Sequence, residues 1–280
     1  MPIWGCAFLL LARSWLPRTE GTVRLGITGR GAASRIGELH QAGAARVRFP
    51  RPSAAGIEAV FINTAGGLTG GDRLDIAVAL AEGSLALLAG AAAEKIYRAR
   101  DEEAAEIRVA LTLAAGARGV WLPQPTILFD GARLERRTSV ALASDASLLA
   151  LEIVVFGRGA MGEELATGAV ADGWRVRRAG ELVFADTLRL EGGIAGKHGK
   201  AMLDGARAAA LLIYAAPDAG ARLPEATARV AALSGTAGAS AVNGLLLVRA
   251  LAGDALLLRR DMGALVEWLS ARPLPRVWQC

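Results

Sequence analysis

Histidine, cysteine and aromatic residues are scarce in this sequence. Its 280 residues include two histidines and two cysteines, and aromatic residues make up 5%. The two cysteines, Cys6 and Cys280, stand near opposite ends and form no disulfide framework, so we expect a reducing, cytoplasmic location. The motifs HExxH, Cys-x-x-Cys and Gly-x-Ser-x-Gly are absent. A tight metal site with soft ligands and a hydrolase nucleophile elbow are therefore not expected.

Clustered positive charge is also missing. The formal net charge is +5, from 32 Lys and Arg against 27 Asp and Glu, and no basic run is interleaved with aromatic residues. We therefore expect no nucleic-acid partner. The longest uncharged stretch, 230–248, contains serine, threonine, asparagine and glycine. It is too polar to span a bilayer, so we expect no membrane association.

The middle of the chain has the pattern of β-strands. Hydrophobic residues alternate with small or polar ones at 74–80 and 107–113, as in strands that bury one face. The apolar run 148–156 predicts a strand buried on both faces. Turn signals separate these segments; residues 178–181 indicate a hairpin, and the pair at 172–173 indicates a further turn.

The last third of the chain contains two helical patterns. Residues 224–233 have proline near the first helical position, and residues 254–270 carry apolar side chains at helical spacing. The sequence therefore predicts a mainly β fold, a large antiparallel multi-strand arrangement of stacked sheets with two α-helices in the C-terminal third. No long linker divides it, so we expect a single domain over 21–280 after an N-terminal extension at 1–20.

A glycine-rich segment, Asn63-Thr-Ala-Gly-Gly-Leu-Thr-Gly-Gly-Asp72, is the most unusual part of the sequence. Two Gly-Gly pairs indicate backbone conformations closed to other residues, or a close approach of another part of the chain. It is not a phosphate-binding P-loop, because Asp72 stands where that loop has lysine. Two interpretations stay open: a tight turn, or a shaped loop that directs Asn63, Thr64 and Asp72 inward.

Three further segments place polar residues beside apolar ones. Charges in 94–98 end an apolar run and predict either an ion pair or an interior polar site. Gln124 stands between two prolines, which favours a rigid corner over a site. Glu152 interrupts the apolar run 148–156, and a buried carboxyl group must be paired, protonated or in contact with water. An ion pair with an arginine is the favoured interpretation.

The segment Gly157-Arg-Gly-Ala-Met-Gly162 fits the Gly-x-Gly-x-x-Gly dinucleotide pattern and follows a predicted strand. It offers an alternative function, an NAD(P)-binding oxidoreductase. Such a site needs a helix that begins at the glycines, but Gly168 is expected to break one early. Glu163 and Glu164 would also repel a pyrophosphate. A second alternative is a general β-sandwich interaction module with a partner unrelated to metal.

Several segments together resemble the UreD (UreH) family of urease accessory proteins. The matching segments occur in the family's order and extend over roughly residues 20–280; they are 63–74, 92–98, 121–127, Glu152, 156–163, 172–175 and 275–278. The resemblance implies a non-enzymatic scaffold for nickel insertion into urease. It also implies three partners: the urease apoprotein, a UreF-like protein and, through that protein, a UreG-like GTPase.

The resemblance further implies that Ni²⁺ passes transiently through a polar tunnel, with no tightly bound cofactor. Oxygen ligands that bind weakly suit such a passage, whereas a cage of cysteine and histidine would trap the metal. The candidate metal-contacting residues are Asp72, Glu94, Glu152 and Glu163. The remaining tunnel and loop candidates are Asn63, Thr64, Gly66, Gly67, Gly70, Gly71, Lys95, Tyr97, Arg98, Gln124 and Arg158.

Overall fold

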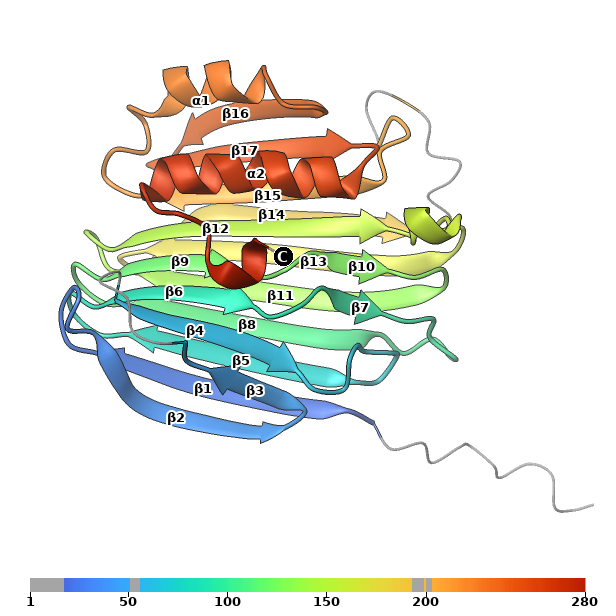
Figure 1. Ribbon diagram of the computed structural model, residues 1–280, viewed down its shortest axis with the longest axis horizontal. Coiled ribbons are helices and arrows are strands. Elements are labelled where there is room, and N and C mark those ends of the chain that lie inside the picture. The colour runs from blue at the N-terminus through green and yellow to red at the C-terminus, as the bar shows by residue number, and fades with distance from the viewer. Residues whose placement is uncertain (1–17, 51–55, 193–198, 200–202, 280) are drawn as a thin grey trace, which may run out of the picture.

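The computed structural model describes residues 18–50, 56–192, 199 and 203–279. Within these ranges, two β-sheets are stacked face to face, and two helices lie on the outer side of one of them (Figure 1). The mainly β class, the stacked sheets and the two C-terminal helices are thereby confirmed. Most of the predicted N-terminal extension at 1–20 lies outside the described residues. No helix in the described ranges is long and apolar enough to cross a membrane.

The first sheet has seven strands. They are β1 (Glu20–Thr28), β2 (Arg35–Gly43), β5 (Arg73–Leu80), β8 (Ala105–Leu113), β11 (Ala132–Leu142), β13 (Gly168–Arg178) and β14 (Glu181–Glu191). Their spatial order is β14-β13-β11-β8-β5-β1-β2. The predicted hairpin at 178–181 joins β13 to β14, with Ala179 and Gly180 both at positive φ. This conformation is that of a two-residue type I′ turn.

The second sheet has ten strands. They are β3 (Ala45–Arg48), β4 (Ile57–Asn63), β6 (Leu85–Gly90), β7 (Glu94–Ile96), β9 (Arg118–Leu122), β10 (Thr126–Leu128), β12 (Ser147–Phe156), β15 (Ala208–Ala215), β16 (Thr236–Val242) and β17 (Leu245–Ala252). Eight of them form the path β16-β17-β15-β12-β9-β6-β4-β3, and β10 pairs with β12 and β7. The helices are α1 (Leu223–Val230) and α2 (Ala255–Ser270).

From β4 to β13 the chain passes back and forth between the two sheets, although β6 and β7, and likewise β9 and β10, follow each other within the second sheet. Strands that neighbour each other in one sheet therefore come from successive turns of this winding and run in the same direction. Nine of the fifteen strand pairings among the described residues are parallel. The predicted antiparallel arrangement is wrong in this respect. Period-two alternation reports which face is buried, and it carries no information on strand direction.

Strand β12 is buried on both faces, as its apolar run predicts. Leu148, Ala150 and Val154 belong to the core between the sheets, whereas Leu151 and Ile153 belong to a second core beneath the helices. Glu152 has the same parity as the first group, so its carboxyl group lies on the inter-sheet side. The strand order thus brings an acidic side chain into the space between the two sheets.

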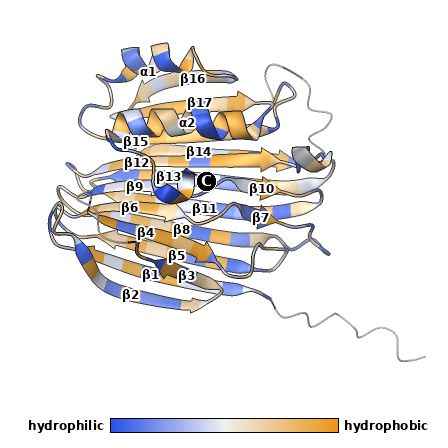
Figure 2. Cartoon of the chain, in the orientation of Figure 1, coloured by the Kyte–Doolittle hydropathy of each residue, from blue (hydrophilic) through white to orange (hydrophobic). Residues whose placement is uncertain are grey.

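Helix α2 covers the outer face of the second sheet. Asp254 caps its first turn by accepting hydrogen bonds from the backbone N–H groups of Leu256 and Leu257. The side chains predicted to face the core, which include Met262 and Leu265, are buried against β12, β15 and β17. Figure 2 shows the mixed polar and hydrophobic colouring of this helix beside the largely hydrophobic β17. The helix closes this side of the sheet and leaves the inter-sheet space as the interior.

Candidate functional site

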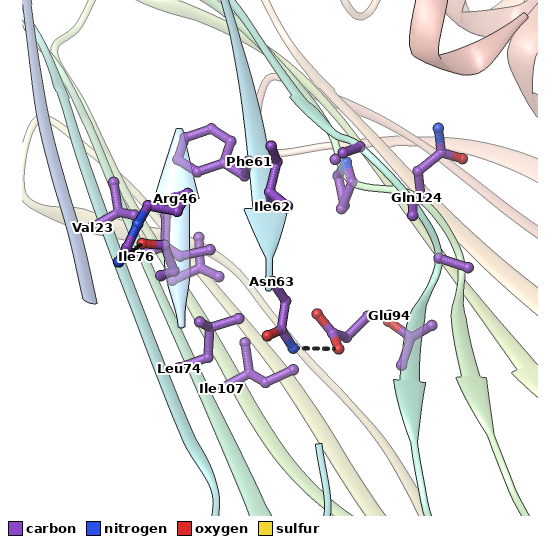
Figure 3. Close-up of a pocket in the computed structure, with 18 of the residues that line it drawn as sticks. Val23, Arg46, Phe61, Ile62, Asn63, Leu74, Ile76, Glu94, Ile107 and Gln124 are labelled. Atoms are coloured by element: carbon purple, nitrogen blue, oxygen red, sulfur yellow. Dashed lines mark hydrogen bonds between the residues drawn. The ribbon is translucent and has the colours of Figure 1, made fainter. Parts of the chain in front are cut away.

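A cavity of about 120 Å³ lies between the two sheets and forms the first part of the site. Its walls are largely apolar, with Phe61 and Trp121 from the second sheet and Ile76 and Ile107 from the first (Figure 3). Its polar lining residues are Arg46, Asn63, Glu94, Gln124, Thr126, Arg136 and Glu152. We call this space cavity one. It brings together five residues predicted from the sequence: Asn63, Gly66, Glu94, Gln124 and Glu152.

Glu94 begins the short strand β7 and contributes a carboxylate to cavity one. Its Oε1 accepts a hydrogen bond of 2.9 Å from Nδ2 of Asn63, at the end of β4 (Figure 3). Burial raises the pKa of Glu94, while the Asn63 bond and the positive charge of Arg136 act against that rise. No ion pair is formed by Glu94 in the described part of the chain. Of the two interpretations of segment 94–98, the interior polar site therefore holds at this residue.

Glu152 belongs to a buried triad with Arg136 and Asp172, each only 5% exposed. Arg136 Nη1 lies 2.6 Å from Glu152 Oε1, and it also donates to the hydroxyl of Thr126 at 2.7 Å. Arg136 Nε and Nη2 donate to the two carboxylate oxygens of Asp172, at 2.9 and 2.6 Å. The favoured interpretation of Glu152, an ion pair with an arginine, is confirmed.

One positive charge in the triad faces two carboxyl groups. Burial raises the pKa of Glu152 to about 8, and the nearby charge of Asp172 adds to the rise, while Arg136 opposes it. The two carboxylates raise the pKa of Arg136 against its own burial, so the guanidinium stays charged. Asp172 holds Arg136 through two bonds and Glu152 holds it through one. Glu152 is therefore the less firmly held of the two acids, and its pKa is raised by burial.

A second cavity, of about 590 Å³, meets the triad from the other side. We call it cavity two. Glu152 lines both cavities, whereas Arg136 lines cavity one and Asp172 lines cavity two. The wall of cavity two also contains Trp174, and the ion pair of Asp186 with Arg249 at 2.7 Å. The triad thus stands at the boundary between two inter-sheet spaces.

Each cavity is lined by a tryptophan whose buried indole N–H group has no hydrogen-bond partner among the described residues. The indole nitrogen of Trp121, in the lining of cavity one, has no hydrogen-bond partner among the described residues. The indole of Trp174 lies close enough to Glu152 to favour its ionised form, although it does not reach hydrogen-bond geometry. Buried donors beside other polar groups are usually satisfied by water. The polar residues along the triad therefore suit a hydrated ion, although the remaining walls of both cavities are largely apolar.

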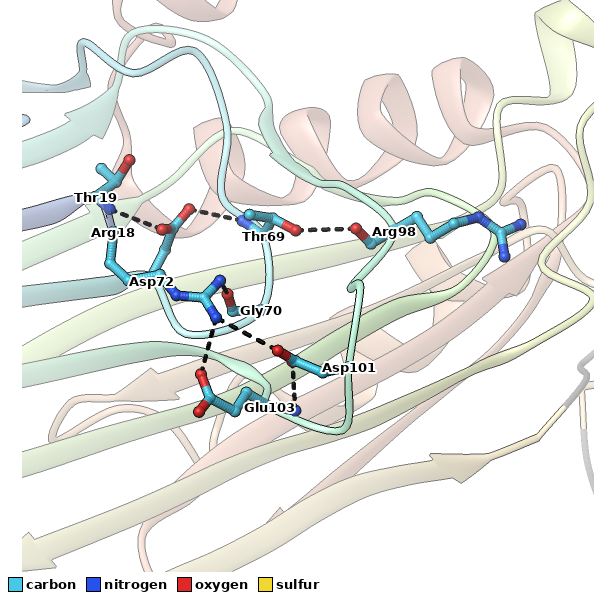
Figure 4. A network of polar contacts seen from close by, with 8 residues as sticks. All are labelled: Arg18, Thr19, Thr69, Gly70, Asp72, Arg98, Asp101 and Glu103. Atoms are coloured by element: carbon cyan, nitrogen blue, oxygen red, sulfur yellow. Dashed lines mark hydrogen bonds and ion pairs between the residues drawn. The ribbon is translucent and has the colours of Figure 1, made fainter. Parts of the chain in front are cut away.

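Asp72 lies outside both cavities, in the glycine-rich turn. Its carboxylate accepts hydrogen bonds from the backbone N–H of Thr19 at 2.7 Å and of Thr69 at 2.8 Å (Figure 4). Beside it, Arg18 donates to the carbonyl oxygen of Gly70 and pairs with Glu103 at 3.2 Å. Asp72 is 4% exposed, and both its oxygens serve the turn.

The glycines of this turn meet the conditions that the sequence predicts. Gly71 has a φ of +83°, a value that favours glycine, and a side chain there would collide with Arg18. A Cβ atom on Gly67 would lie 2.5 Å from the ring of Tyr97, and one on Gly70 would lie 2.5 Å from the carbonyl oxygen of Glu103. Gly66 is the member of the group that lines cavity one. Both original interpretations hold in part, because the segment is a tight turn whose first residue, Asn63, faces the cavity.

Other predicted residues gather at the edge where β7, β10 and β12 end. We call Tyr97, Arg98, Phe129, Arg158 and Glu163 the rim cluster. Arg98 pairs with Asp130, Arg158 pairs with Glu163, and the guanidinium of Arg158 lies 4.4 Å from the ring centroid of Phe129. Tyr97 packs edge-on against the same ring and donates a hydrogen bond to the carbonyl of Gly66. Hydrogen bonding from Arg158 lowers the pKa of Glu163, whose side chain is partly buried.

The remaining candidates have separate places. Thr64 donates its hydroxyl to the carbonyl of Ala44, and Lys95 is exposed. Gln124 donates to the carbonyl oxygen of Val277 at 2.6 Å and accepts from Arg259 at 3.2 Å. It thereby fastens the C-terminal segment to the sheet, in keeping with the rigid corner that its prolines predict.

The dinucleotide interpretation of Gly157–Gly162 is not favoured by the structure. Only a three-residue 3-10 helix, Gly159–Met161, follows β12, and β13 begins at Gly168. No helix end is therefore present there to bind a pyrophosphate. In addition, Glu163 folds back onto Arg158, which occupies the one cationic side chain in the loop.

Arg136 and Asp172 are the functional residues that the sequence interpretation missed. The pair at 172–173, predicted as a turn, lies within β13, where Asp172 stands opposite Arg136 in the parallel register. The alternation of buried and exposed residues along β11 and β13 marks both residues. Arg136 shares the buried phase of Leu134 and Val140, and Asp172 shares that of Val170. A charged residue on an apolar phase of a strand predicts a buried partner, as Glu152 does.

The acidic residues of the site do not form a cluster of metal ligands. In the described ranges, no group of three or more His, Cys, Asp or Glu side chains is placed to hold a metal ion. The acids of the site are instead distributed along the interior. Glu94 and Glu152 share cavity one, Asp172 follows in cavity two, and Glu163 lies in the rim cluster.

Comparisons with known proteins extend over almost the whole chain. A family model described as UreD urease accessory protein matches residues 19–279. Urease accessory protein UreD 3 of Bradyrhizobium sp. strain BTAi1 is 49% identical over 262 residues, which are 93% of this chain and 94% of that protein. Urease accessory protein UreD of Azorhizobium caulinodans is 47% identical over 93% of this chain and 96% of its own length. Urease accessory protein UreD of Methylobacterium sp. strain 4-46 is 47% identical over 94% and 95%, respectively.

Proposed function

Because the chain belongs to the UreD family of urease accessory proteins, we propose that it acts in urease maturation as a non-catalytic scaffold for nickel insertion. It binds the urease apoprotein and a UreF-like protein, and through the latter a UreG-like GTPase, in the cytoplasm. The names of its relatives support the maturation role. The identity of the three partners rests on the family resemblance and is part of the proposal.

The proposed route of Ni²⁺ runs between the two sheets. The observation that carries it is the position of Glu152, which lines both inter-sheet cavities, with Glu94 in the first of them. Carboxylate, amide and water oxygens bind Ni²⁺ less tightly than thiolate and imidazole ligands do. An ion on this route can therefore be released to the apoenzyme. The proposal assigns Glu163 to the rim and gives Asp72 a structural role in the turn.

The test uses this chain co-expressed with UreF-like and UreG-like proteins and urease in a host without its own urease. Nickel per active site and specific activity are measured on the purified urease. The variants Glu94→Gln and Glu152→Gln should lower nickel loading on the order of tenfold, because each removes one anionic oxygen ligand from the route. Glu225→Gln is the matched control, since Glu225 is an exposed acid on α1 paired with Arg229.

Two results would contradict different parts of the proposal. Normal nickel loading with both glutamine variants, in complexes that assemble fully by size-exclusion chromatography, would reject the interior route. Equal nickel loading without this chain would reject the scaffold role.

A further inference from the structure

Arg136 occupies the boundary between the two cavities, and every polar atom of its guanidinium group faces a partner. Two of its nitrogens hold Asp172 on the side of cavity two, and the third holds Glu152 and Thr126 on the side of cavity one. Strand β11 places it there, between β8 and β13 in the first sheet. An ion that moves from Glu94 to Asp172 has to pass this side chain.

Stability alone does not explain such a triad. Buried ionic groups are often no more stabilising than well-packed apolar residues of the same volume, because removing the charges from water is costly. Two buried carboxylates without Arg136 would attract a divalent cation strongly, since charge interactions are amplified away from bulk water. Such a site would retain the ion that the proposed route has to release.

We propose that Arg136 is a resident counter-cation, which offsets the negative charge of Glu152 and Asp172 and so prevents the boundary between the cavities from becoming a metal trap. This inference rests on the proposed nickel route and assigns the residue that sets how long the ion stays there. The ligand class is a hydrated divalent cation with oxygen ligands. Arg136 acts on it by repulsion and by competition for Glu152.

The unequal contacts of Arg136 decide which of the two acids exchanges Arg136 for an arriving cation. Its two bonds to Asp172 anchor the guanidinium on β13, whereas its contact with Glu152 uses a single nitrogen. A cation arriving from Glu94 displaces that single contact while Arg136 remains on Asp172. The other charges that line the two cavities are Glu94 and Arg46 in cavity one and the Asp186–Arg249 pair in cavity two, which neutralise each other. Water in the cavities keeps the moving ion partly hydrated.

The experiment measures metal retention by the purified full-length chain, co-purified with its UreF-like partner. Arg136→Met removes the charge and keeps much of the volume. Without metal, its melting temperature should fall, because two buried acids lose their partner. Adding Ni²⁺ should restore the melting temperature, and about one Ni²⁺ per chain should remain after desalting. Binding should be at least about tenfold tighter than in the unmodified chain, whose melting temperature Ni²⁺ leaves unchanged.

A variant that lacks all three charges of the triad is the matched control. The triple variant Arg136→Met, Glu152→Gln, Asp172→Asn keeps the shape of the triad and should regain thermal stability without retaining Ni²⁺. If Arg136→Met does not fold, Arg136→Lys replaces it. Its ammonium is a point charge that cannot bridge both acids, so Ni²⁺ retention should rise above that of the unmodified chain.

The outcomes separate this inference from the proposed function. Nickel retention by Arg136→Met or Arg136→Lys that equals that of the unmodified chain overturns it. Retention by the triple variant as strong as that by Arg136→Met also overturns it. These measurements need no urease. A nickel route that failed the glutamine test would therefore leave the retention experiment interpretable.

Discussion

Two regions of this protein bury carboxylates in different ways, and the contrast separates a structural acid from an acid available to a ligand. In the glycine-rich turn, both oxygens of Asp72 accept backbone N–H groups. In cavity one, Glu94 accepts one side-chain amide and faces open space, and burial raises its pKa. Asp72 is buried within the turn, whereas Glu94 is half-buried and lines a cavity. The distinction lies in whether the surroundings of each carboxylate leave room for a ligand.

The largest expected effect tests the structural half of this contrast. Asp72→Ala leaves the amides of Thr19 and Thr69 without an acceptor, and it should lower the free energy of unfolding by roughly 3 kcal/mol. Asp72→Asn should lose about half as much, because its amide offers one acceptor oxygen. Glu94→Gln should change the same quantity by less than about 1 kcal/mol. Urea denaturation at pH 7 measures all three changes. Equal losses for Asp72→Ala and Glu94→Gln would contradict the distinction between a structural acid and an acid available to a ligand.

A smaller effect concerns the pH dependence of stability. The folded-state pKa of Glu152 is raised to about 8, above its ordinary value, so the native state keeps a proton that the unfolded chain releases near pH 4.5. Stability from this group is fully present below the unfolded value and is lost as pH rises toward 8, by on the order of 2 kcal/mol. Glu94, whose pKa is also raised, adds in the same direction.

The measurement is urea denaturation between pH 5 and pH 8.5. Glu152→Gln should flatten the decline in stability over this interval, and Asp72→Asn should leave its slope unchanged. A slope of the opposite sign, or one that Glu152→Gln does not alter, would show that Glu152 is ionised throughout.

The smallest effect is expected at Asn63, which joins the two regions. Its Oδ1 accepts from the backbone N–H of Ala65 at the start of the turn, and its Nδ2 donates to Glu94. Asn63→Asp keeps the acceptor for the turn and places a second carboxyl group beside Glu94. We expect a loss of about 1 kcal/mol at pH 7.5 that largely disappears at pH 5.5, where Glu94 can carry the shared proton. A loss independent of pH would assign the role of Asn63 to the turn alone.

The sequence predicts the class of this fold better than its strand directions. Hydrophobic alternation locates strands, and a proline and apolar side chains at helical spacing locate the helices, because these signals are local. Direction depends on whether the chain stays in one sheet or crosses to the other, and segments of either kind have the same alternation. The parallel pairing of β11 with β13 is the clearest example.

The candidate site was predictable in part for the same reason. Glu152 stands out because it interrupts an apolar run, and its need for a partner follows from burial alone. Its partner, Arg136, lies among other charged residues in Arg133-Leu-Glu-Arg-Arg137, where only the phase of the alternation distinguishes the inward side chain. Asp172 was hidden by the glycine that follows it, because Asp-Gly is also a turn signal.

The alternation of the chain between sheets also sets an order for biosynthesis. Glu94, Arg136, Glu152 and Asp172 belong to β7, β11, β12 and β13, which leave the ribosome in that order. A nascent chain that ends before β13 would expose Arg136 with a single acid, and an open sheet edge beside it. A partner that binds before β13 has joined its sheet would therefore bind a protein whose interior charges are not yet balanced. We expect productive assembly with partners to be post-translational.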